Sequence, residues 1–155
     1  MRHPGLAADV RRERLLAQAR GRVLDIGEDP KWMTRGDLQM HSFDTIVSVF
    51  QLCGANDVFS TLLRVNELLA DDGRLLVLEH VRSTGRRGRF QDALAPVWRR
   101  VTGGCRANRD VVGLLRANGF AVTDCDRFEI RGATPLVRHA VSAVAIRRVR
   151  NEVKA

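Results

Sequence analysis

The sequence predicts an α/β fold with a mostly parallel sheet and a C-terminal antiparallel hairpin. Three observations carry this prediction. Residues 45–49, TIVSV, are too uniformly apolar for a strand with one wet face, which is typical of a central parallel strand covered by helices on both sides. Residues 57–81 then follow the pattern of a helix, a turn and a second buried strand. Two strand-like segments, 120–130 and 136–149, close the chain and predict the hairpin.

In the first 82 residues each element has a local signal. An arginine-rich helix is expected within 1–21, and core strands and a helix within 22–82. Asp57 is suited to cap a helix over 58–69, whose apolar residues recur at helical spacing. The Asp71-Asp72-Gly73 triplet is expected to end that helix in a turn before a strand over 75–81.

The second half begins with a basic amphipathic insertion at 83–107. Its apolar residues fall at helical intervals between arginines, and Pro96 predicts a kink or a break into two helices. Such a helix either packs on its own domain or forms a lid or a peripheral membrane contact. Residues 108–149 then form a helix and the closing hairpin, with Asn108 expected to cap the helix and Gly119 to follow it.

Composition bounds the class of protein. The 155 residues suit a single domain, 1–155, that can bury a core without disulfides or metals. The 26 basic and 18 acidic residues give a net charge of +8, which favours anionic partners but also arises from coding bias toward arginine. No apolar run reaches the ~20 residues needed to span a bilayer, and the N-terminal stretch lacks the apolar segment of a secretory signal.

The three cysteines, Cys53, Cys105 and Cys125, lie far apart in the sequence and form no CxxC pair. We therefore predict no metal site from their spacing, and expect each thiol to act as a small apolar side chain. Reduced thiols suit a cytoplasmic location.

Four stretches in order carry a family resemblance: RVLDIG (22–27), SFDTIVSVFQLC (42–53), DDGRLLVLEHVRS (71–83) and GGCRANRDVVGLLRANGF (103–120). They resemble the motifs of class I methyltransferases that use S-adenosylmethionine, in the branch that methylates small molecules, quinones, lipids and thiols. The resemblance implies a Rossmann-like methyltransferase fold, with S-adenosylmethionine as cofactor and a small-molecule or lipid-like methyl acceptor.

The stretch between Gly27 and Phe43 is shorter than in that family. At about 3.3 Å per strand residue and 1.5 Å per helix residue, it can supply one crossover but not two strands and two helices. The fold is therefore expected to be truncated there. Two alignments of the junction stay open: Gly27 begins a collapsed cofactor loop, or GEDPKWM matches the second motif and makes Glu28 the ribose ligand.

Ligands of open α/β sheets bind at the C-terminal ends of the parallel strands, which makes the loop after residue 49 the first candidate site. With the resemblance, the candidate cofactor-binding residues are Asp25, Gly27, Glu28, Phe50, Gln51 and Leu52. Glu79 and His80 end the second buried strand and are candidates for proton transfer, although neighbouring strand residues point to opposite faces. Asn108 and Arg109 match a stretch that contacts substrate in the family.

Three functions are compatible with these features. The first is a methyltransferase with an incomplete cofactor loop, and no obligatory catalytic residue is required because the methyl donor is already activated. The second is a non-catalytic binding module that forms a homodimer, since deleted strands leave an open sheet edge beside the first strand. The third, a nucleic-acid-binding domain, has the charge but lacks a recognised motif and has few aromatic residues for stacking.

Overall fold

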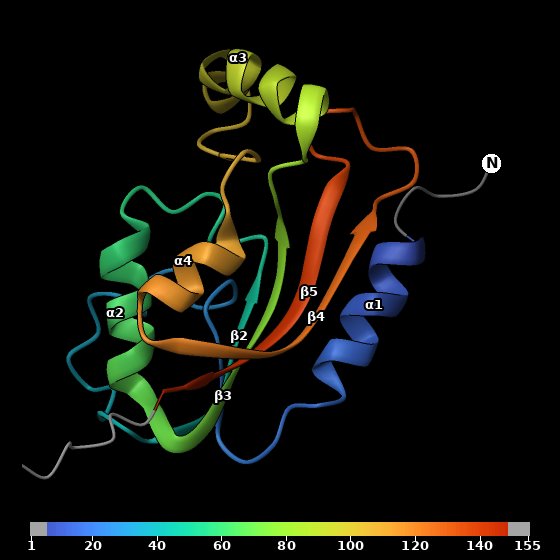
Figure 1. Ribbon diagram of the computed structural model, residues 1–155. Helices are drawn as coiled ribbons and strands as arrows, with labels where there is room; N and C mark the ends of the chain where they lie inside the picture. The colour runs from blue at the N-terminus through green and yellow to red at the C-terminus, as the bar shows by residue number, and fades with distance from the viewer. Residues whose placement is uncertain (1–5, 149–155) are drawn as a thin grey trace, which may run out of the picture.

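A five-stranded sheet forms the centre of the computed structural model, which describes residues 6–148 (Figure 1). The strand order is β1-β2-β3-β5-β4, with bounds β1 (Val23–Asp25), β2 (Phe43–Val49), β3 (Leu69–His80), β4 (Phe120–Glu129) and β5 (His139–Arg147). Strands β1, β2 and β3 are parallel, and β5 is antiparallel to both of its neighbours. The structure therefore confirms the predicted parallel sheet and closing hairpin; residue 149 of that prediction lies outside the described residues.

The helices cover the two faces of the sheet unequally. Their bounds are α1 (Leu6–Leu16), α2 (Val58–Leu68), α3 (Gly85–Val101) and α4 (Val111–Ala117). Helices α2 and α4 lie on one face and α1 on the other (Figure 1). The larger apolar core lies between the sheet and α2 and α4, whereas a small cluster around Leu15, Leu76 and Leu78 fills the α1 side. Both faces of β2 and β3 are thus buried, as the uniform apolar runs predict.

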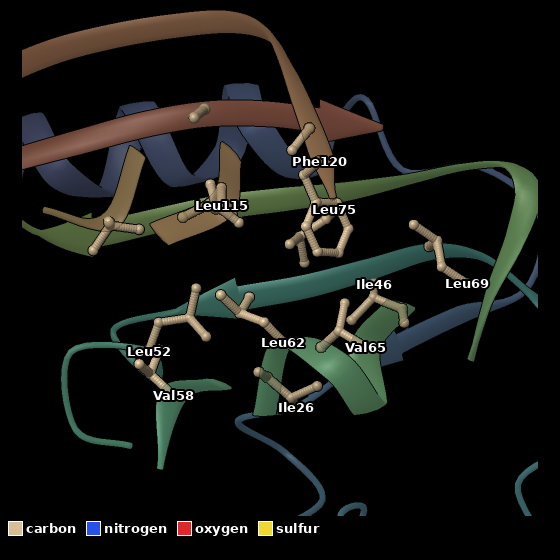
Figure 2. Close-up of a cluster of buried hydrophobic side chains, with 14 of the residues drawn as sticks. Ile26, Ile46, Leu52, Val58, Leu62, Val65, Leu69, Leu75, Leu115 and Phe120 are labelled. Carbon is tan, nitrogen blue, oxygen red and sulfur yellow. The ribbon is translucent and has the colours of Figure 1, made fainter. Parts of the chain in front are cut away.

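The larger core explains why residues 58–68 fold as a helix against this sheet. Leu62 and Val65 on α2 have no solvent exposure and point toward Ile46 of β2, while Phe120 packs beside Leu75 (Figure 2). Burying side chains of this size contributes about 1.5–3 kcal/mol each. Asp57 caps the helix as predicted, because its carboxylate accepts a hydrogen bond from the Ser60 amide.

The connection from β1 to β2 contains turns but no assigned helix or strand, so the expected crossover is irregular. Trp32 and Leu38 anchor it by packing into the core. Within the connection, Arg35 forms ion pairs with Asp29 and Asp37, which lower the pKa of both carboxyl groups.

The predicted turn at 71–73 is instead an irregular part of β3. The register to β2 shifts between Phe43 paired with Leu69 and Thr45 paired with Arg74, and the extra residues form a bulge. Helix α2 thus passes directly into the strand.

Helix α3 lies above the C-terminal ends of β2 and β3 (Figure 1). It is a single helix with Pro96 inside, so the break considered from the sequence is not found. Its apolar residues Phe90, Val97 and Val101 are exposed, and the buried Gln91 fixes the helix by accepting from the Ser83 amide and donating to the Leu136 carbonyl. Among the described residues, no helix is long and apolar enough to cross a membrane.

The cap of α4 differs from the prediction. Asp110, not Asn108, precedes the first turn, and its carboxylate accepts a hydrogen bond from the Gly113 amide. Asn108 donates to Asp92 instead. Gly119 follows the helix with a φ of 85°, as expected for a glycine at that position.

Replacing the cap tests this assignment. We expect Asp110→Ala to lower the free energy of unfolding by about 1 kcal/mol, because a helix amide loses its acceptor. Asn108→Ala, the matched control, removes only an exposed hydrogen bond and should cost less than about 0.5 kcal/mol. Urea unfolding of both variants measures the difference, and a larger loss for Asn108→Ala would contradict the cap.

Candidate functional site

The carboxylate of Glu79 organises the loop that follows β2. Its side chain has no solvent exposure, and Oε1 accepts hydrogen bonds from Ser48 Oγ at 2.7 Å and from the amides of Gln51 and Leu52 at 2.9 Å. Oε2 accepts from the Cys53 amide at 3.1 Å. Burial raises the pKa of Glu79, and the four donors oppose this effect because they stabilise the ionised form.

Phe50 begins this loop in an unusual backbone conformation. Its φ of 54° lies in the left-handed region, which is costly for a bulky residue and is found where surrounding contacts enforce it. The Phe50 amide still donates to the Leu78 carbonyl at 2.8 Å, and its ring stacks on that of His80 with centroids 4.5 Å apart. The left-handed turn therefore brings the aromatic ring over the end of β3.

A second loop, after α3, docks on the first. Gly103 and Gly104 have φ values of 71° and 127°, which let the chain reverse at the end of the helix. The Arg106 amide then donates to the Cys53 carbonyl at 2.7 Å. The Arg109 guanidinium donates to the carbonyls of Leu52 and Ala55, the latter at 2.6 Å.

This docking brings together three side chains that are far apart in the sequence. Cys53 Sγ lies 3.7 Å from Cys105 Sγ, and each sulfur lies 3.7 Å from His80 Nδ1. The contact with Cys53 and the nearby His80 lower the pKa of Cys105, whereas the contact with Cys105, burial and the charge of Glu79 raise the pKa of Cys53. The two docked loops thus place both thiols and the imidazole within reach of one another.

A cleft of about 260 Å³ opens beside this loop at the C-terminal edge of β1 and β2. Its walls come from the connection after β1, the loop after β2 and helix α2. The lining residues are Ile26, Trp32, Met33, Phe50, Gln51, Gly54, Ala55 and Thr61. A larger cleft of about 870 Å³ lies at the opposite edge of the parallel strands, next to Met40 and Arg147. We assign the smaller cleft as the candidate ligand site, because open α/β sheets bind ligands at the C-terminal edge.

Asp25 and Gly27 form the turn in which β1 ends. The Asp25 carboxylate accepts a hydrogen bond from the Gly27 amide at 2.8 Å, which gives this acid within an apolar strand its partner. A Cβ at position 27 would lie 3.1 Å from Gln51 Nε2, so glycine allows the two loops to approach closely. Glu28 is exposed in the same turn.

Several solved structures with similar folds are methyltransferases. No family model matches the sequence. A proposed methyltransferase of Bacillus halodurans aligns with a TM-score of 0.67 and 10% identity over 92% of this chain and 100% of its own. A SAM-dependent methyltransferase of Thermotoga maritima, proposed to be a histamine N-methyltransferase, aligns at 0.63 and 14% identity over 92% and 90%.

A third structure is 1,6-didemethyltoxoflavin-N1-methyltransferase of Burkholderia thailandensis with bound 1,6-didemethyltoxoflavin and S-adenosylhomocysteine. It aligns with a TM-score of 0.52 and 18% identity over 76% of this chain, which spans 48% of its length. The chain has the class I methyltransferase fold. The shortened β1 to β2 connection agrees with the truncation expected from the sequence.

Within this methyltransferase fold, the candidate residues occupy different positions. Phe50 and Gln51 line the cleft, but the Leu52 side chain is buried in the core with 1% exposure. The backbone amide and carbonyl of Leu52 are already bound by Glu79 and Arg109, so its placement does not support a ligand contact. Glu79 is enclosed by the loop it binds, so its placement does not support proton exchange with a substrate. Arg109 holds the loop carbonyls, and Asn108 pairs with Asp92.

Sequence reasoning missed two features of the site. The position of Glu79 at the end of a strand makes it a candidate for proton transfer, whereas its complete burial and four hydrogen-bond donors fit a structural acceptor. The Cys53, His80 and Cys105 cluster was missed because the expected signal was a short cysteine spacing. One signal could have found the cluster: Cys53 follows β2, His80 ends β3 and Cys105 follows α3, and all three elements end on the same side of the sheet.

Glu79→Gln tests the role of the carboxylate. A glutamine amide can replace Oε1 as acceptor, but its NH₂ group faces the Cys53 amide, so a buried donor loses its partner. We expect a loss of about 1–3 kcal/mol in the free energy of unfolding, measured by urea denaturation. Glu67→Gln, which affects only a partly exposed pair with Arg64, should change it by less than about 0.5 kcal/mol. Equal effects would contradict the loop-anchoring role.

Proposed function

We propose that this protein binds S-adenosylmethionine in the 260 Å³ cleft and methylates a small-molecule or lipid-like acceptor. The observation that carries the proposal is the position of this cleft at the C-terminal edge of β1 and β2, in a fold shared with SAM-dependent methyltransferases. The fold alone does not assign the activity; the chemistry of the cleft supports it.

The residues of the cleft suit the proposed cofactor. Trp32, Met33 and Phe50 supply aromatic and thioether surface, and a sulfonium cation is attracted to aromatic faces. The side chain of Gln51 lines the cleft and supplies a hydrogen-bonding amide group. Gly27 permits close approach of the two loops. Glu28, exposed in the turn after β1, is our candidate for the ribose hydroxyls, since a carboxylate accepts two hydrogen bonds.

The protein's own contribution to methyl transfer would be alignment. When bound, the cofactor supplies a methyl group that is already activated for nucleophilic attack. The loop after β2, which forms one wall of the cleft, is held by Glu79 and Arg109, so it can help to fix the donor and acceptor in line. The acceptor would approach from beneath α3, which lies above this edge of the sheet (Figure 1).

A pair of methionine variants tests which cleft binds the cofactor. Met33 is 38% exposed and lines the proposed cleft, whereas Met40 is 59% exposed and lines the larger one at the opposite edge. We expect calorimetry to detect stoichiometric binding of S-adenosylmethionine and S-adenosylhomocysteine. Met33→Ala should weaken it about fivefold, the equivalent of about 1 kcal/mol of lost apolar contact, and Met40→Ala should leave it unchanged.

The opposite pattern would move the site to the larger cleft. Absence of binding by the unmodified protein, together with a dimer in light scattering, would favour a non-catalytic module whose partner copy covers the β1 edge. β1 is the outermost strand of the sheet: three of its residues pair with β2 on one side, and Val23 is exposed.

A further inference from the structure

We propose that Cys53, His80 and Cys105 form a binding site for a thiophilic metal ion, with zinc as the ion that the donor set favours. One ligand atom from each residue lies within 4.8 Å of the other two. The site is distinct from the proposed cofactor cleft and does not depend on methyl transfer. Two sulfur donors and one imidazole nitrogen are a common ligand set for Zn²⁺, in contrast to the oxygen ligands that Mg²⁺ and Ca²⁺ prefer.

The distances between the ligand atoms match tetrahedral coordination. With Zn–S at about 2.3 Å and Zn–N at about 2.0 Å, tetrahedral angles place two sulfurs about 3.8 Å apart and a sulfur and a nitrogen about 3.5 Å apart. The observed separations are 3.7 Å for the sulfur pair and 3.7 Å from each sulfur to Nδ1. An ion can therefore bind with almost no movement of the ligands. A disulfide, at about 2.05 Å, would require the two sulfurs to move much closer together.

Two of the three ligands, Cys53 and His80, are held by contacts outside the cluster. Cys53 is fixed on both sides, because its amide donates to Glu79 and its carbonyl accepts from the Arg106 amide. The His80 ring is stacked on Phe50, and this contact orients Nδ1 toward the sulfurs. Outer contacts of this kind preorganise a metal site.

The charge of the site also suits a divalent ion. Two thiolates and a neutral imidazole cancel the charge of Zn²⁺, so the complex adds no net charge to a region that is largely enclosed.

Three protein ligands leave a fourth coordination position. Among residues 6–148, no further histidine, cysteine, aspartate or glutamate belongs to the group, so water or a bound molecule would complete the tetrahedron. Zinc sites with three protein ligands are typical of reactive rather than purely structural zinc. Gln51, Gly54 and Ala55, which flank Cys53 in the same loop, line the cleft, and the ion would therefore lie beside it.

Cobalt titration of the full chain tests the site. The protein is reduced with a phosphine, freed of metal and titrated with Co²⁺ in the absence of S-adenosylmethionine, so that failure of cofactor binding cannot affect the result. We expect one equivalent to give thiolate-to-cobalt charge-transfer absorption and the intense visible bands of tetrahedral cobalt. Zn²⁺ should displace the cobalt and remain bound at one equivalent after gel filtration.

Two cysteine variants separate this site from adventitious binding to thiols. Cys105→Ser, at a half-buried position that can accept the smaller atom, should weaken binding at least about 100-fold and remove the charge-transfer band. Cys125→Ser removes an exposed thiol outside the cluster and should change neither. Circular dichroism of both variants verifies folding.

Equal binding by Cys105→Ser and the unmodified protein would overturn the proposal. So would a reduced protein that takes up neither metal while mild oxidation joins Cys53 to Cys105, since that result assigns the pair to redox chemistry. If Cys125→Ser alone lost the metal, the binding would belong to the exposed thiol and the proposed site would be wrong.

Discussion

The buried carboxylate of Glu79 is the interaction on which the site depends. It accepts the amide hydrogens of three consecutive residues, 51–53, and the hydroxyl of Ser48. An ionised group without solvent costs several kcal/mol unless donors surround it, and the loop supplies these donors only in its observed conformation. The carbonyls of the same loop face outward, where the Arg106 amide and the Arg109 guanidinium bind them. Donors on one side and acceptors on the other are thus satisfied by different segments, which makes an irregular loop as fully hydrogen-bonded as a strand.

The fold could be predicted largely from apolar pattern and capping. The uniform runs at 45–49 and 75–81 allow no wet face, and parallel pairing between helices is the arrangement that buries both of their faces. Local signals failed where two residues could serve the same role. Asn108 and Asp110 both suit a helix cap, and the choice depends on Asp92, a distant partner that binds the first of them. The sequence predicts a turn where β3 has a bulge, because aspartate and glycine favour both, and only the register to β2 distinguishes them.

The site was predictable to the extent that it follows from the sheet edge. Phe50 and Gln51 line the cleft, as expected from the rule that open α/β sheets bind ligands where the parallel strands end. What the sequence does not contain is the docking of the loop after α3 on the loop after β2. Residues 53 and 105 become neighbours only through that long-range contact, and neither has a local pattern that indicates it. The same holds for Glu79, whose four partners lie at least 26 residues away along the chain.

The shortened connection between β1 and β2 determines what the cleft can hold. Pockets for drug-sized ligands enclose about 300–1,000 Å³, and the 260 Å³ here lies just below that range. The wall beside Phe50 is rigid, because hydrogen bonds hold it from both sides. The wall beside Trp32 is held by the buried side chains of Trp32 and Leu38 and by the ion pairs of Arg35. Among the described residues, no strand pairs with the outer side of β1 to support this wall. A cofactor would therefore be enclosed on the side of β2 and β3 and remain open toward β1. Such one-sided enclosure would limit affinity, because the part of the ligand toward β1 gains fewer contacts with the protein.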